Sequence, residues 1–240
     1  MTARVAALWI AGLLCVGCTT RPPTIAHVHI GHAITGVHVT PHEEGYFVVA
    51  EKHAKTVYDF STEASNAADL ATMKQDIAEA VKDNDSEPDF GVKHAIVMAA
   101  NHINFAATSD DASTNVQQSA PIFAAHVTRV VERCDLISLL GNDVANSQSM
   151  DEARVSIQQI QKLALANISG EGSAAGGHDS SVPSEYGLVQ LRHELDAMIA
   201  RENPPYRTVD QWYLFNLVRL PNGRWVFDKL GRGGNIEGYK

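Results

Sequence analysis

Apolar residues recur at three- and four-residue steps through most of the chain between residues 44 and 202. This spacing places them on one face of an α-helix, so it predicts a series of amphipathic helices. Helices packing these faces together would form a bundle, and the pattern predicts a mainly α fold of about five helices. The expected helices are residues 44–82, as one helix or two broken near 61–66, then 89–107, 119–140, 150–168 and 185–202.

Local signals predict where several of these helices begin and end. Ser149 and Glu152 have the spacing of a capping box, in which each side chain satisfies an exposed backbone amide of the first turn. Pro121 suits the first turn of the third helix, and Gly141 can end that helix. Ser184 is expected to cap the last helix.

The two ends of the folded region have a different pattern. Residues 212–227 are rich in β-branched and aromatic residues around a Pro-Asn-Gly turn at 221–223, which predicts an antiparallel hairpin. Residues 27–32 alternate polar and apolar, which predicts a short strand that can join this hairpin in a small sheet. Residues 169–184 are rich in glycine and serine and predict a flexible loop. We therefore expect a single domain over residues 27–240.

Histidine is the most informative residue type for chemistry, because six of the 11 histidines fall between residues 27 and 53. In an extended strand His27 and His29 share a face, and His32 follows a glycine. Three imidazoles suit zinc or copper and leave an open position for water or substrate. The alternative is that these side chains are solvated or form hydrogen bonds at a strand edge. The candidate metal ligands are His27, His29, His32, His38, His42 and His53.

A weaker second candidate set lies on one predicted helix. His94, Met98 and His102 step by four residues and so form a stripe along it, and imidazole with thioether is a ligand set that suits copper. The alternative is that they pack against neighbouring helices. Cys134 lies in an apolar helical pattern that predicts a buried structural cysteine, with a thiolate metal ligand as the alternative.

The first residues predict export. Arg4 precedes an apolar run over residues 5–14 that is much shorter than the roughly 20 residues needed to span a bilayer. The run ends in Leu14-Cys15-Val16-Gly17-Cys18, which resembles the bacterial lipoprotein signal, although Cys15 stands where that signal usually has leucine. The alternative is an ordinary secreted protein that is cleaved nearby.

The lipoprotein resemblance implies a location and a partner. Residues 1–17 would be removed, Cys18 would carry fatty acyl chains such as palmitate, and residues 18–26 would form a tether to the fold. The membrane is then a partner through the lipid anchor, and the protein faces the periplasm from the cell envelope. Threonine rather than aspartate after Cys18 resembles lipoproteins of the outer membrane, if the organism has one.

Charge and cysteine count narrow the function classes. Removal of residues 1–17 takes away Arg4 and no acidic residue, so the formal charge changes from −9 to about −10. An acidic chain repels phosphate backbones, which excludes nucleic acid as an expected partner. With Cys15 removed and Cys18 acylated, Cys134 is the remaining thiol, so no intrachain disulfide is expected.

Together these patterns favour an exported, lipid-anchored accessory protein. It would bind zinc or copper through its amino-terminal histidines and serve transport, buffering or delivery, with an envelope protein as a possible partner. The alternative is a structural or interaction lipoprotein with no bound ligand. A third hypothesis is a metal-dependent hydrolase with a metal-bound water, although the sequence has no His-Glu-x-x-His motif and no Gly-x-Ser-x-Gly motif.

Overall fold

The computed structural model describes residues 24–85, 90–171 and 186–206, together with three short strands further along the chain. Within these residues the chain forms seven α-helices, which confirms the mainly α prediction. A short 3-10 helix, η1 (Pro41–Glu43), lies between the first two of them. The α-helices are α2 (Ile25–Ile34), α3 (Tyr46–Asn66), α4 (Leu70–Asp85), α5 (Val92–Thr108), α6 (Thr114–Asn146), α7 (Met150–Ser169) and α8 (Leu188–Ala200).

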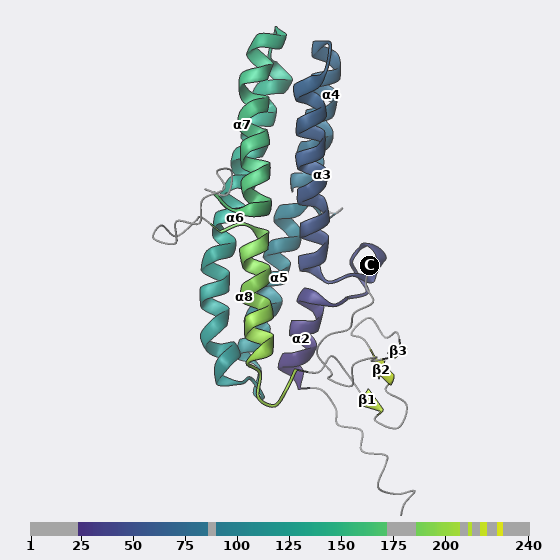
Figure 1. Ribbon diagram of the computed structural model, residues 1–240, viewed down its shortest axis with the longest axis vertical. Coiled ribbons are helices and arrows are strands. Elements are labelled where there is room, and N and C mark those ends of the chain that lie inside the picture. Colours follow the sequence, from purple (N-terminus) through teal and green to yellow (C-terminus); the bar gives the residue numbers. More distant parts are fainter. Residues whose placement is uncertain are drawn as a thin grey trace, which may run out of the picture.

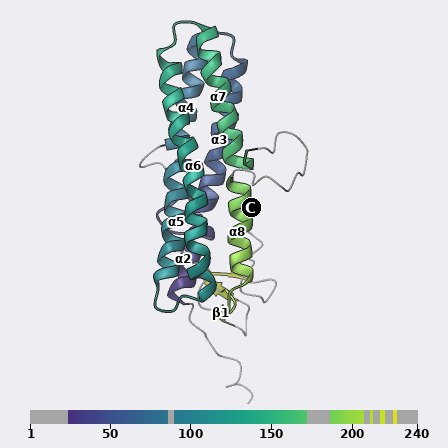
Figure 2. The ribbon, with the colours of Figure 1, turned by 90° about the vertical axis from the view of Figure 1, so that its left-hand side faces the viewer.

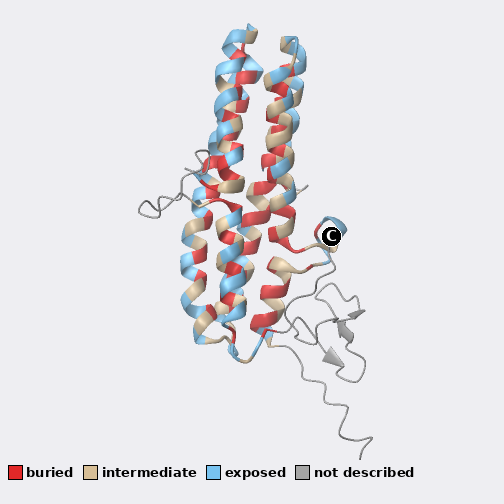
Figure 3. Ribbon diagram, in the orientation of Figure 1, coloured by how far each residue is buried: buried red, intermediate tan, exposed pale blue. Residues whose placement is uncertain are grey.

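The helices form an elongated bundle around the 33-residue helix α6, which runs along most of its length (Figures 1 and 2). At one end α6 packs with α4 and α7, and α3 packs against both of these helices; at the other end the first half of α6 packs with α5 and α8. Helix α2 lies beside α5 at this second end (Figure 1). Buried residues follow the inward faces of the helices, as the amphipathic pattern predicts (Figure 3).

Several predicted helix ends are confirmed. Ser149 caps α7, where its hydroxyl accepts a hydrogen bond of 3.2 Å from the backbone amide of Glu152. The region predicted as one helix or two is two helices, and the chain turns at residues 67–69 immediately after the predicted break. The side chain of Asp69 accepts hydrogen bonds from the backbone amide and hydroxyl of Thr72, which supports the start of α4. Cys134 is buried, as predicted.

The predicted ends of the helix at 119–140 are wrong. It begins after Ser113, which caps it, so Pro121 lies beyond the first turn. It also continues past Gly141, because that glycine is buried close to Val81 of α4 and allows the two helices to approach. Tertiary packing therefore outweighs the local preference of glycine for a helix end. The predicted cap Ser184 and most of the loop at 169–184 lie outside the described residues, and α8 starts after Gly187.

The predicted strand at residues 27–32 is also wrong, because these residues belong to helix α2. Ala26, Ile30 and Ala33 are fully buried and follow steps of four and three residues, which is the helical period. Six alternating residues were too few to distinguish this period from that of a strand. Of the predicted tether at 18–26, residues 18–23 lie outside the described part of the chain. Its last two residues, Ile25 and Ala26, are the first two of α2.

Strands occur near the carboxyl terminus, where β1 (Gln211–Trp212), β2 (Leu217–Arg219) and β3 (Trp225–Phe227) pair antiparallel in this order. The residues that join them lie outside the described part of the chain. The continuous hairpin at 212–227 and its position as a cover for the bundle therefore stay predictions. Among the helices that the structure describes, none is both long and apolar enough to cross a membrane.

A close backbone contact fixes how the chain passes from α2 to α3, and it can be tested. A Cβ atom at Gly45 would lie 2.4 Å from the carbonyl carbon of Ile34 and 2.7 Å from the amide nitrogen of Thr35. Backbone atoms cannot rotate away, so we expect Gly45→Ala to lower the free energy of unfolding by about 1–3 kcal/mol. Urea denaturation measures this change. A variant as stable as the native protein would show that the two helix ends do not meet so closely.

Candidate metal centre

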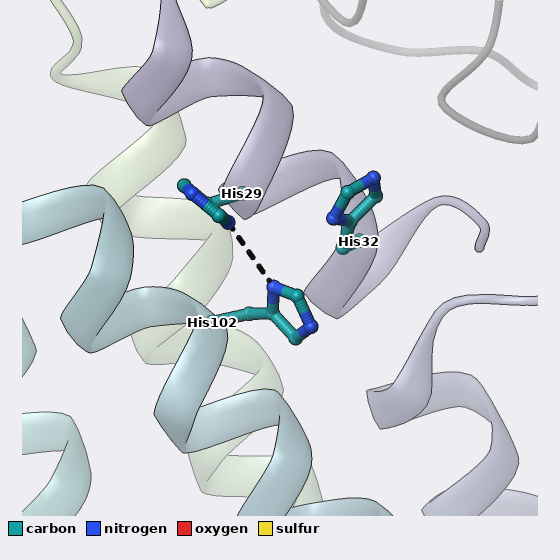
Figure 4. A group of neighbouring side chains, drawn as sticks. All are labelled: His29, His32 and His102. Atoms are coloured by element: carbon teal, nitrogen blue, oxygen red, sulfur yellow. Dashed lines mark hydrogen bonds between the residues drawn. The ribbon is translucent and has the colours of Figure 1, made fainter. Parts of the chain in front are cut away.

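Helix α2 presents two of the candidate histidines on one face. Its start is fixed by Thr24, whose hydroxyl accepts a 3.0 Å hydrogen bond from the backbone amide of His27. His29 and His32 are three residues apart and therefore lie on the same side of the helix. That side faces α5, from which His102 projects toward both of them (Figure 4). The three rings meet between two helices that are far apart in the sequence.

The geometry of these three rings suits a bound ion. Each offers one nitrogen, and these three atoms all lie within 4.8 Å of one another. The Nδ1 atoms of His29 and His102 are 3.2 Å apart. Two nitrogen ligands at 2.0–2.1 Å from a tetrahedral zinc ion would be separated by about 3.3 Å. Two of the three imidazoles are therefore already at a ligand-to-ligand distance, and His32 needs a small side-chain movement to complete the set.

The surroundings of the cluster are aromatic. Tyr46 stacks on the His102 ring with centroids 5.2 Å apart, and the partly exposed Phe105 lies 5.5 Å from His29 and 5.8 Å from His102. The Nδ1 atom of His32 is buried and has no hydrogen-bond partner among the residues that the structure describes. A buried polar atom without a partner is costly, and a metal ion would remove this cost.

Burial keeps the three imidazoles in the neutral form that binds metals. It lowers the pKa of His29, although the charge of Asp111 acts in the opposite direction. Burial, followed by the charges of His29 and His38, lowers the pKa of His32. Burial, followed by the charges of His32 and His29, lowers the pKa of His102 to about 4. Metal ions therefore compete with few protons for these ligands at neutral pH.

His27 does not join this group, although it was predicted to share a face with His29. Residues two apart point to nearly opposite sides of a helix, so His27 faces the end of α8 instead. It is buried, and its Nε2 atom lies 3.1 Å from Oε2 of Glu202. Burial alone would raise the pKa of Glu202, but hydrogen bonds from His27, Ser113 and Asn115 outweigh it and lower this pKa.

The other amino-terminal candidates are not members of the three-histidine cluster. His38 is exposed, with its Nδ1 atom 3.2 Å from a carboxylate oxygen of Glu43. His42 is exposed in η1. His53 on α3 lies 2.6 Å from Oδ1 of Asp83 on α4. His38 and His53 thus each belong to a different local contact.

The second candidate set does not converge either. His94 packs edge-on against Phe90 with ring centroids 5.2 Å apart, and Met98 packs against the apolar core. His102 instead joins the two histidines of α2. Cys134 is an unsuitable ligand, because burial raises the pKa of its thiol to about 12 and keeps it protonated.

The sequence pattern grouped His102 with His94 and Met98 and not with His29 and His32, because it treated the histidines of each segment separately. The spacing of His29 and His32 matches one face of a helix, and that signal was available once a helix was considered. Their approach to a helix some 70 residues away depends on tertiary packing, which no local pattern shows.

Comparison with known proteins finds no matching family model, no matching curated protein and no matching solved structure. The geometry of the histidine cluster therefore carries the functional argument alone.

The depressed pKa values predict how stability depends on pH. Between about pH 6.5 and pH 4 these histidines bind protons in the unfolded chain but stay largely neutral in the folded protein. The free energy of unfolding should therefore fall as the pH is lowered. His102→Gln should remove about 1–3 kcal/mol of this pH-dependent loss in the metal-free protein. Denaturation at pH 7 and pH 4.5 measures the difference, with exposed His193→Gln as the control. Equal pH dependence in both variants would contradict burial of a neutral His102.

Proposed function

We propose that this protein is a transition-metal-binding accessory protein whose ligands are His29, His32 and His102. The observation that supports this most is the convergence of three partly buried imidazoles, each offering one nitrogen, with these three atoms within 4.8 Å of one another. Without an ion, gathering three partly desolvated rings is unfavourable, and so is a buried nitrogen of His32 that has no partner among the described residues. A metal ion turns the same arrangement into a favourable one.

Zinc or copper fits this ligand set best, because three neutral imidazoles suit either ion. Three protein ligands leave a fourth position for water, for a side chain such as His38, or for a group from a partner. An open position suits a protein that receives an ion and passes it on, which favours transport, buffering or delivery.

The hydrolase hypothesis has less support than metal binding alone. Hydrolysis at a zinc ion normally uses a general base beside the metal-bound water. Among the described side chains, those in ring contact with the three histidines are the aromatic Tyr46 and Phe105. Neither side chain is a base at neutral pH, and both oxygens of the nearby carboxylate of Asp111 already accept hydrogen bonds from backbone amides of α2. The cluster is therefore better suited to holding an ion than to activating water.

We further propose that the protein is an exported lipoprotein of the cell envelope, facing the periplasm. This part of the proposal rests on the resemblance of residues 14–18 to a lipoprotein signal, and these residues lie outside the described structure. Because the described fold begins at Thr24, six residues after Cys18, the anchor would hold the metal centre close to the membrane surface. This arrangement suits exchange of an ion with an envelope protein.

Metal binding is tested by removing two ligands together. The double variant His29→Ala, His102→Ala should bind zinc and copper at least about 100-fold more weakly than the native protein, because ligands from both helices are lost. Calorimetry in competition with a chelator of known affinity measures the change, and circular dichroism checks that the helices remain.

Matched controls separate the cluster from other histidines. The double variant His53→Ala, His193→Ala removes one paired and one exposed histidine outside the cluster and should bind the metal as the native protein does. No measurable affinity in the native protein, or equal affinity in both double variants, would favour the interaction lipoprotein that binds no ligand.

The lipid anchor is tested by Cys18→Ser. Loss of the thiol that receives the acyl chains should release the protein from membranes or block its processing, because each buried methylene contributes about 0.8 kcal/mol to membrane binding. Detergent partitioning and mass spectrometry of the mature protein measure this. Unchanged cleavage and unchanged partitioning of the variant would contradict an anchor at Cys18.

A further inference from the structure

The amino terminus of α2 is held by a residue that lies 86 positions further along the chain. Asp111, in the connection between α5 and α6, accepts a 2.6 Å hydrogen bond from the backbone amide of Ile25 through Oδ2. Its other oxygen, Oδ1, accepts a 3.0 Å hydrogen bond from the backbone amide of Ala26. One carboxylate therefore binds two successive amides of a distant helix.

Together with the Thr24 hydroxyl, this carboxylate supplies partners for the first three amides of α2. The Thr24 hydroxyl accepts from the amide of His27, and its carbonyl oxygen accepts from the amide of Val28 at 3.1 Å. The first amides of a helix have no helical partner, and here those of Ile25, Ala26 and His27 each have a partner from Asp111 or Thr24. A negative charge at this end also interacts favourably with the helix dipole.

A contact through both carboxylate oxygens fixes the position of α2 along and around its axis relative to α5. His29 lies one helical turn after Ile25, and His102 lies on α5 nine residues before Asp111. Sliding α2 by one residue would move His29 by about 1.5 Å relative to His102. Metal–ligand distances tolerate only about 0.2 Å, so the cluster depends on this alignment.

The charge of Asp111 also reaches the cluster. It acts on the His29 ring, where it opposes the lowering of the pKa by burial. A divalent ion bound by three neutral imidazoles adds two positive charges to a partly buried site. A nearby carboxylate would lower the cost of placing that charge there.

We propose that Asp111 is a positioning residue of the metal centre, which aligns His29 and His32 of α2 with His102 of α5 and stabilises the bound cation by its charge. This inference rests on the proposed metal-binding function. It goes beyond that function by assigning the affinity of the site to a side chain that is not a ligand.

The test uses two substitutions of Asp111 and one matched control in the full-length protein. Asp111→Asn keeps one acceptor oxygen and removes the charge, whereas Asp111→Ala removes both. Asp110→Asn makes the same charge change at an exposed neighbour that forms no hydrogen bond to α2 within the described residues. Zinc affinity is measured by chelator competition, and the visible absorption of bound Co²⁺ reports the ligand geometry.

We expect Asp111→Ala to weaken zinc binding by about 10- to 100-fold and Asp111→Asn by a smaller factor, with Asp110→Asn within twofold of the native protein. Asp111→Ala should also lose the intense visible bands of tetrahedral Co²⁺. If the native protein binds zinc and both Asp111 variants match Asp110→Asn, the positioning role is wrong while the metal site stands. If the native protein binds no zinc, the proposed function itself is wrong.

Discussion

Docking of α2 onto α5 is the constraint on which the candidate metal centre depends. This ten-residue helix is too short to be stable alone, so tertiary contacts must hold it in place. Its apolar side chains Ala26, Ile30 and Ala33 are fully buried in the core. On another side, buried His27 pairs with Glu202, which also accepts hydrogen bonds from residues at the start of α6. The helix is thus fixed from several directions before any ion binds.

This rigidity explains how the protein can hold three imidazoles together without a metal. Burial lowers the pKa of each ring, so at neutral pH the rings are uncharged and do not repel one another. The 3.2 Å contact between Nδ1 of His29 and Nδ1 of His102 is compatible with one protonated and one unprotonated nitrogen. An ion would replace that shared proton. The folded chain therefore pre-organises the site, and binding requires little rearrangement beyond His32.

The helical bundle could be predicted from sequence because each long helix carries its own period. The buried face of α7 and the cap at Ser149 are local signals, and both are confirmed. Helix α2 could not be recognised in this way, because six residues do not distinguish a helical period from alternation. The continuation of α6 past Gly141 depends on the contact of this residue with Val81 of α4, a helix that is distant in the sequence. Prediction was wrong where packing between distant segments decides the structure.

The same reasoning applies to the candidate site. The sequence drew attention to His29 and His32 because histidines are concentrated near the amino terminus, but it grouped them with His27 and left out His102. Pairing of His27 with Glu202 involves residues 175 positions apart, and the contact of His29 with His102 spans 73. Residue type thus indicated the chemistry, whereas the ligand set required the three-dimensional fold.

X-ray absorption spectroscopy of the zinc-loaded, full-length protein tests the central claim most directly, because it counts and identifies the ligands. If α2 and α5 together form the site, the spectrum will show three imidazole ligands with zinc–nitrogen distances of about 2.0–2.1 Å and no sulfur ligand. A sulfur atom near 2.3 Å, or a shell with at most one imidazole, would contradict this account.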